Sequence, residues 1–179
     1  MDLAALAADL RRVTVELADA GRAVGSGVVW ATDRVVTAAH VVPHAHAMVR
    51  RADGGRAHGR VVARDRDNDL ALLHVPGLGS SAATLGAADE LRVGSLLVAV
   101  GHPFGVRGAL TTGIVHAMGA FGPAGRSWIQ GDLRLVPGNS GGPLADARGR
   151  VVGINAMIVG GLALAIPVSD VTRFVRAAG

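Results

Sequence analysis

Apolar residues fall in short stretches that alternate with glycine and polar residues, and most stretches have the length and β-branched content of strands. In the first half of the chain these stretches span 12–17, 24–30, 34–42, 47–51, 59–65 and 69–75. In the second half they span 96–100, 109–118, 127–133, 142–146, 150–159 and 162–167. Strands at such regular spacing, with turn residues between them, are typical of sandwiches and barrels. The pattern therefore predicts an all-β protein.

A segment rich in Gly, Ser and Ala, residues 76–91, separates the two sets of strands and has little strand pattern of its own. We therefore expect two β-barrels, an N-terminal one over residues 1–82 and a C-terminal one over residues 83–179. A cleft between two such units is a common place for a binding or active site.

Helical patterns appear near the two ends of the chain. Leucines at helical spacing predict a short amphipathic helix at the start. These are Leu3, Leu6 and Leu10. A second helix is expected over residues 169–178, with Ser169 as its N-cap. Its apolar face consists of Val171, Phe174 and Val175.

The uncharged segment 151–169 is long enough to be considered as a membrane span. It contains Gly160 and Gly161, which favour a turn between two strands, so we expect a buried hairpin and no membrane partner. The N-terminus carries Asp2 and Asp9 and lacks the basic and apolar regions of a signal peptide. In the absence of a targeting signal, the default prediction is a cytoplasmic location. A location in the cell envelope stays open if a targeting segment has been removed from the sequence.

Composition excludes several function classes. The 179-residue chain is 50% hydrophobic and 18% charged, which favours a packed core over disorder. Without cysteine it has neither disulfides nor a thiolate metal site. Arginines cluster between Arg50 and Arg66, but aspartates interrupt the cluster and no aromatic residue within it can stack on bases. We interpret the cluster as a solvated face and expect no nucleic-acid partner.

Three short motifs carry candidate chemistry, in the order histidine, aspartate, serine. His40 ends the motif TAAH, Asp69 opens DLALL, and Ser140 lies within GNSGGPL. Serine is a weak nucleophile unless a base takes its proton, and histidine titrates near working pH. An aspartate would hold the imidazole in the right tautomer. Taken singly, each motif has a bland explanation as a core residue, turn or loop. Together, in this order, they predict a nucleophilic triad.

These motifs resemble those of the trypsin-like (chymotrypsin-fold) serine peptidases. The sequences GHPFG at 101–105 and LALAIP at 162–167 make the resemblance closest to the HtrA/Deg branch, here without a PDZ domain. The resemblance implies two six-stranded antiparallel β-barrels with a short N-terminal and a C-terminal helix. It also implies a serine endopeptidase of family S1 that cleaves unfolded or flexible polypeptides through an acyl-enzyme. The oxyanion hole would be the segment Gly138, Asn139 and Ser140, with the N–H groups of Gly138 and Ser140 as donors.

The resemblance also places a specificity pocket, S1, at Leu135, Ile158 and Val159. Such a pocket suits an apolar residue before the scissile bond, and Arg134 stands where basic-specific trypsins have an aspartate. We expect no cofactor and no metal. His44 and His46 follow His40 closely, and a His-x-x-x-His pattern can bind zinc on a helix, but Pro43 interrupts any helix here and no Glu accompanies the pair. The resemblance implies a homo-oligomer, a trimer, but the N-terminal helix lacks the aromatic residues that often mediate trimers in the family, so the oligomeric state stays open.

Two other functions stay open on the sequence alone. The chain could be a peptide-binding module, or a resting pseudo-peptidase in which the oxyanion loop, residues 135–139, is collapsed. A flipped peptide at Gly138 would support the resting form. A structural protease-fold subunit is the third option, and the intact triad argues against it.

Overall fold

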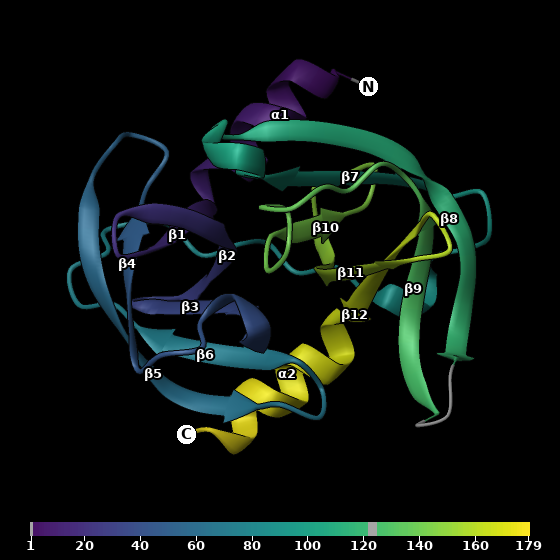
Figure 1. Cartoon of the computed structure of the whole chain (residues 1–179). Helices are drawn as coiled ribbons and strands as arrows, with labels where there is room; N and C mark the ends of the chain where they lie inside the picture. The colour runs from purple at the N-terminus through teal and green to yellow at the C-terminus, as the bar shows by residue number, and fades with distance from the viewer. Residues whose placement is uncertain (1, 122–124) are drawn as a thin grey trace.

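The β-branched stretches of the first half pair into a closed antiparallel barrel (Figure 1). The computed structural model describes residues 2–121 and 125–179. Neighbouring strands follow the order β1-β2-β3-β6-β5-β4 around the barrel. The strands are β1 (Thr14–Asp19), β2 (Arg22–Ala31), β3 (Arg34–Ala38), β4 (His46–Arg50), β5 (Arg56–Asp65) and β6 (Leu70–His74).

The second half forms another closed six-stranded barrel, in the order β10-β11-β12-β9-β8-β7. Its strands are β7 (Leu96–Gly101), β8 (Ala109–Phe121), β9 (Arg126–Asp132), β10 (Pro143–Ala145), β11 (Val151–Val159) and β12 (Leu162–Pro167). The uncharged segment is the β11–β12 hairpin, with its turn at Gly160 and Gly161. The two antiparallel barrels confirm the predicted fold class. The first barrel ends at His74 and the second begins at Leu96, so a domain boundary at residue 82 stays a prediction.

Two α-helices complete the described part of the chain, together with three single 3₁₀ turns. The side chain of Asp2 caps α1 by accepting the N–H groups of Ala4 and Ala5. No helix in residues 2–121 and 125–179 is long and apolar enough to cross a membrane. The helices are α1 (Leu3–Arg12) and α2 (Val168–Ala177), and the turns are η1 (Ala39–Val41), η2 (Ala88–Glu90) and η3 (Pro103–Gly105).

The C-terminal helix begins earlier than its sequence predicts. Its N-cap residue is Pro167, and no side chain caps it, so the prediction of Ser169 as the N-cap is wrong. Pro167 is held at φ −60° by its ring and lacks the N–H that a helix start would leave unpaired, so the helix can begin directly after it. Val171 is fully buried, as expected for the apolar face.

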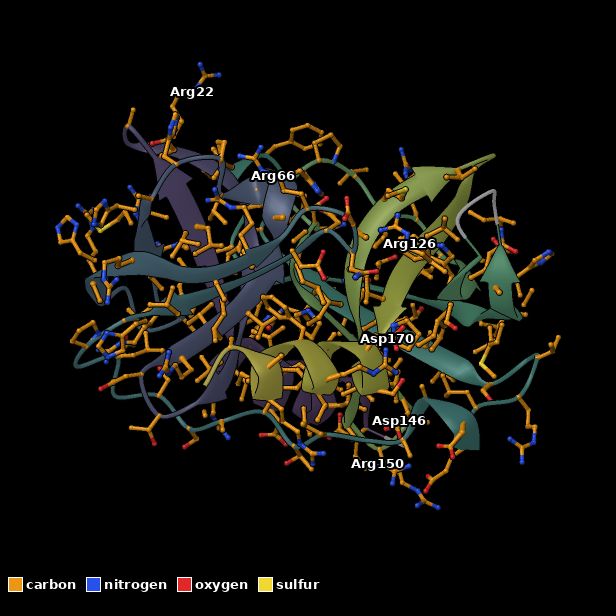
Figure 2. All side chains as sticks on the ribbon, turned by 90° about the horizontal axis from the view of Figure 1, so that it is seen from below. Arg22, Arg66, Arg126, Asp146, Arg150 and Asp170 are labelled. Carbon is orange, nitrogen blue, oxygen red and sulfur yellow. The ribbon has the colours of Figure 1, made fainter. Side chains whose placement is uncertain are left out.

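One apolar cluster joins both barrels and both helices. It contains Val36 and Leu72 from the first barrel, Val100 from the second, Leu10 from α1 and Val171 from α2. Each barrel also has a separate interior cluster. Figure 2 shows α2 lying across the face of the molecule seen from below. This shared core fixes the two barrels relative to each other, and with them the residues at their junction.

Candidate active site

Strand register places His40 and Asp69 side by side. β3 and β6 pair antiparallel, with Ala38 opposite Leu70. One further step in the same register brings Asp69 opposite Ala39, whose N–H donates to the Asp69 carbonyl at 3.0 Å. The turn η1 then carries His40 past the end of the strand, where its side chain is half exposed.

The Asp69 carboxylate holds His40 through two hydrogen bonds. Oδ2 lies 2.8 Å from His40 Nδ1, and Oδ1 accepts the His40 backbone N–H at 3.0 Å. Asp69 has a left-handed backbone, φ 55°, which aspartate adopts more readily than most residues. The hydrogen bond to Asp69 raises the pKa of His40, against an opposing effect of burial. Because Nδ1 faces the carboxylate, Nε2 is the nitrogen left to exchange a proton.

Ser140 lies in the loop between β9 and β10, and this loop packs against the N-terminal barrel. The Ser140 carbonyl accepts the N–H of Ser26 on β2 at 2.9 Å. Gly141 follows with φ +83°, and a Cβ there would overlap the Ser26 carbonyl and the Thr37 hydroxyl. Only glycine permits this approach, which explains the residue after the serine.

The Ser140 hydroxyl is directed toward β11, where it donates to the Ala156 carbonyl at 3.1 Å. Across the residues that the structure describes, no hydrogen bond joins this hydroxyl to His40. Both side chains line the same cavity, so rotation of the serine about its Cα–Cβ bond is the motion that would offer its proton to Nε2. Such hydrogen bonds often form only once substrate is bound.

Two backbone N–H groups next to the serine have no partner. Within 2–121 and 125–179, neither the Gly138 nor the Ser140 N–H donates to a protein acceptor, whereas the Asn139 N–H is engaged inside the loop. The Pro137 carbonyl accepts the Phe104 N–H at 3.4 Å. Since the N–H and C=O of a trans peptide point in opposite directions, the Gly138 N–H points away from η3.

The buried hydroxyl of Ser26, a residue outside the sequence motifs, is hydrogen-bonded to the loop of residues 135–139. Ser26 Oγ donates to the Gly138 carbonyl at 2.7 Å, accepts the His102 N–H at 3.0 Å and lies 3.1 Å from His102 Nδ1. Because the single hydroxyl proton goes to the carbonyl, we assign a proton to Nδ1 of His102. Burial, assisted by the charge of Arg107, lowers the pKa of His102 to about 4, so this histidine is neutral at pH 7.

A mostly apolar cavity of about 340 Å³ contains both His40 and Ser140. Leu135 and Ile158, two of the residues predicted for S1, line it. Val159 does not, because it lies one residue closer to the hairpin turn and is 52% exposed. The other lining residues are Val24, Val136, Pro137, Gly138, Ala156 and Met157.

One side of this cavity is an open strand edge. Residues 157–159 of β11 pair with β12, whereas β10 pairs only with the earlier part of β11, from Val151 to Ile154. Apart from the Ala156 carbonyl, which accepts the Ser140 hydroxyl, the backbone of 156–159 has no strand partner on its other side within the described residues. An extended peptide can add there as a strand. In the described residues, no group of three or more His, Asp and Glu side chains is arranged to hold a metal ion.

Comparison with known proteins gives one matching family. Residues 25–154 match the model of the trypsin-like peptidase domain. A probable periplasmic serine endoprotease DegP-like of Ectopseudomonas mendocina is 40% identical over 156 residues, which cover 82% of this chain and 33% of the relative. Serine protease HTRA1 of Xenopus laevis is 36% identical over 160 residues, covering 84% of this chain and 35% of the relative. The chain thus spans about a third of the length of these relatives.

Solved structures agree over nearly the whole chain. The HtrA-type protease AlgW, determined with a decapeptide, superposes with a TM-score of 0.91 at 26% identity. The match covers 99% of this chain and 67% of that one. A second structure of this protease, with a tripeptide, gives a TM-score of 0.89 at 29% identity and covers 99% of this chain and 63% of that one.

Proposed function

Because the chain belongs to the family of trypsin-like peptidase domains, we propose that it is a serine endopeptidase with His40, Asp69 and Ser140 as its triad. One observation carries the proposal. His40, which is hydrogen-bonded to Asp69, shares a cavity with Ser140, and among the described residues the N–H groups of Gly138 and Ser140 have no protein acceptor.

In the proposed reaction, His40 Nε2 takes the Ser140 proton as Oγ attacks the peptide carbonyl carbon. Asp69 keeps its negative charge and stabilises the imidazolium. The carbonyl oxygen becomes an oxyanion facing the N–H groups of Gly138 and Ser140, each of which would stabilise it by roughly 3 to 4 kcal/mol. His40 then protonates the leaving amine as the C–N bond breaks. Water, deprotonated by the same nitrogen, hydrolyses the acyl-enzyme and restores the serine.

Substrate preference follows from the walls of the cavity. Leu135 and Ile158 would receive an apolar residue before the scissile bond, and the free edge of β11 would pair with the residues preceding it. Strand addition requires an extended segment, so unfolded or flexible polypeptides are the proposed substrates. An apolar pocket discriminates by only about 1 to 3 kcal/mol per methylene, so the preference should be broad.

We propose the cell envelope as the location of the protein. DegP-like relatives are described as periplasmic, which favours this site over the cytoplasmic default of the sequence analysis. A homo-oligomer remains a prediction of the family resemblance. The collapsed-loop alternative is not favoured, because the Pro137 carbonyl is directed to the Phe104 N–H and away from the position that an oxyanion would take.

The test is cleavage of a denatured, permanently unfolded protein by the native chain and by Ser140→Ala, with the cut sites mapped by mass spectrometry. We expect cleavage by the native chain alone, after Val, Ala, Leu or Met. Unchanged substrate with the native chain would refute the peptidase assignment, and cuts after Arg or Lys would refute the proposed pocket.

A further inference from the structure

A second cavity, of about 680 Å³, lies beside the proposed active site and is rich in arginine. Arg22 of β2, Arg56 of β5 and Arg107 after η3 line it together with Arg50 of β4. Throughout 2–121 and 125–179, no carboxylate lies within 4.0 Å of the guanidinium groups of Arg22, Arg56 or Arg107. These three guanidinium groups also donate no hydrogen bond to the described protein atoms.

The one carboxylate in the lining is already neutralised. Glu16 is 2% exposed and accepts a hydrogen bond from Arg50 at 2.9 Å. Two further carboxylates lie nearby. Asp53 is 2.9 Å from Arg51, and Asp19, opposite Arg22 in the β1–β2 register, is 3.5 Å from His44, a contact that is an ion pair only when the imidazole is protonated. The cavity therefore presents three guanidinium groups that are not engaged in an ion pair within the described residues.

The positive charge comes from both barrels. Arg107 follows the η3 turn of the C-terminal half, and its guanidinium reaches the tip of the β4–β5 hairpin, where Nη1 would lie 4.0 Å from a Cβ on Gly54. The positive charge of Arg107 contributes to the lowered pKa of the buried His102, so the electrostatic effect of Arg107 extends into the protein interior. Charges of one sign gathered in a concave site raise the local concentration of oppositely charged groups.

The arginine cavity continues the cleft that holds Ser140. On β2, Val24 lines the cleft, while the preceding residues Ala23 and Arg22 line the arginine cavity. On the other side of the cleft, Gly138 packs closely against Pro103: a Cβ added to Gly138 would lie 2.7 Å from the Cα of Pro103. Phe104, the residue after Pro103, lines the arginine cavity. Phe104 is 78% exposed.

A peptide in the cleft would leave it on this side. Residues before the scissile bond would lie along 156–158 of β11, so the chain beyond Ser140 would pass Val24 and reach Arg22. Val24 and Arg22 are two strand positions apart on β2, about 7 Å at 3.3 Å per residue, so we assign the second to fourth residues after the scissile bond to the arginines. Arginine is the side chain best suited to a carboxylate, because its planar group donates two parallel hydrogen bonds.

We propose that this cavity binds Asp or Glu side chains of the substrate on the C-terminal side of the scissile bond. The proposal rests on the peptidase function above and adds a substrate preference to it. The apolar pocket would select the residue before the bond, and the arginine cavity would favour acidic residues after it.

The experiment compares two peptides that share the sequence before the scissile bond and carry either three alanines or three glutamates at the second to fourth positions after it. We expect a higher kcat/KM for the acidic peptide, with about a three-fold loss for each of Arg22→Gln, Arg56→Gln and Arg107→Gln. The alanine peptide should be cleaved at the same rate by Arg22→Gln and Arg56→Gln as by the native chain. Arg176→Gln, on the exposed side of α2 and outside both cavities, is the matched control and should change neither rate.

Binding to Ser140→Ala, followed by fluorescence anisotropy of both labelled peptides, separates this proposal from the proposed function. Tighter binding of the acidic peptide that weakens in the arginine variants supports the proposal even if neither peptide is cleaved by the native chain. Equal binding and equal cleavage of the two peptides would overturn it, while leaving the peptidase function intact. Competition by inorganic phosphate or by a single-stranded oligonucleotide as strong as that by the acidic peptide would also overturn it, because the site would then bind anions in general.

Discussion

The contact between His40 and Asp69 sets the proton affinity of the imidazole. The hydrogen bond from the ring to the carboxylate raises the pKa of His40, the charge of Asp69 adds to this effect, and burial opposes it. A general base must be neutral before it takes a proton. The acylation rate should therefore rise with pH through an apparent pKa above the ordinary value of histidine.

Asp69→Asn tests this coupling. The amide cannot hold the imidazolium, so kcat should fall by about 10⁴-fold, the loss measured in the prototype triad. The acidic limb of the kcat/KM profile should also move to lower pH. Asp9→Asn, which removes an exposed carboxylate on α1, is the control. An acidic limb that stays in place in Asp69→Asn would show that another group controls the rate.

Ser26 is proposed to position the oxyanion loop rather than to touch substrate. In Ser26→Ala the Gly138 carbonyl keeps only the longer bond from the His102 N–H, at 3.3 Å. The proton on His102 Nδ1 also loses its acceptor, and an unsatisfied buried polar group costs about 1 to 3 kcal/mol, so kcat should fall by roughly 5- to 150-fold with little change in KM. Thr14→Val also removes a buried hydroxyl, which donates to Leu10 far from the loop. A similar fall of kcat in Thr14→Val would mean that general destabilisation is the cause.

The motifs of the sequence indicated His40, Asp69 and Ser140 as reactive groups. His102 stood in the motif GHPFG without a role of its own, and Ser26 stood in none. The triad candidates stand in short motifs with characteristic neighbours. Ser26 and His102 are 76 positions apart in the sequence and meet only after both barrels have formed. A polar residue inside the apolar stretch 24–30 was the one available signal for Ser26.

At the scale of elements, each helix bridges the two barrels. α1 packs against β1 and β7, and α2 packs against β11 and β12 on one side and β6 on the other. Helical spacing predicted both helices because their buried faces are apolar. The start of α2 was missed because the N-cap preference of serine is weaker here than the backbone restraint of the preceding proline.

Leu10→Ala should separate structural from catalytic effects. Leu10 is 1% exposed and lies in the cluster that joins the barrels, so its truncation should lower the free energy of unfolding by about 2 to 5 kcal/mol. Leu3, on the same helix, is 40% exposed, and Leu3→Ala should change stability by less than about 0.5 kcal/mol. Urea unfolding of both variants provides the measurement. Equal losses would indicate that α1 does not hold the barrels together.

For the whole molecule, sequence patterns predicted the two barrels because strand periodicity and turn residues are local signals. The arginine cavity was not predicted. The sequence showed arginines clustered between Arg50 and Arg66, which suggested a solvated face, but only two of them, Arg50 and Arg56, line the cavity. The others in the cavity, Arg22 and Arg107, come from distant strands and turns, and only the closed barrels bring them together.

The pH dependence of stability should reflect the buried His102. Its pKa is about 4 in the folded protein against 6.5 for a free histidine, so between these values the unfolded chain binds a proton that the native protein does not. The contribution of neutral His102 to the free energy of unfolding is fully present above pH 6.5 and is lost as the pH falls toward 4. Between pH 7 and pH 5 the loss should be about 2 kcal/mol. His102→Asn should lack this part of the loss in urea unfolding, and an unchanged pH dependence would contradict the assignment.

Labelling with a fluorophosphonate probe tests the central claim most directly, because the probe reacts only with an activated serine next to a formed oxyanion hole. Intact-mass analysis of the native chain should show one adduct, mapped to Ser140. Ser140→Ala should show none, and His40→Ala should react far more slowly. No adduct on the native chain, even with an unfolded protein present, or an adduct that persists in Ser140→Ala, would contradict the proposed active site.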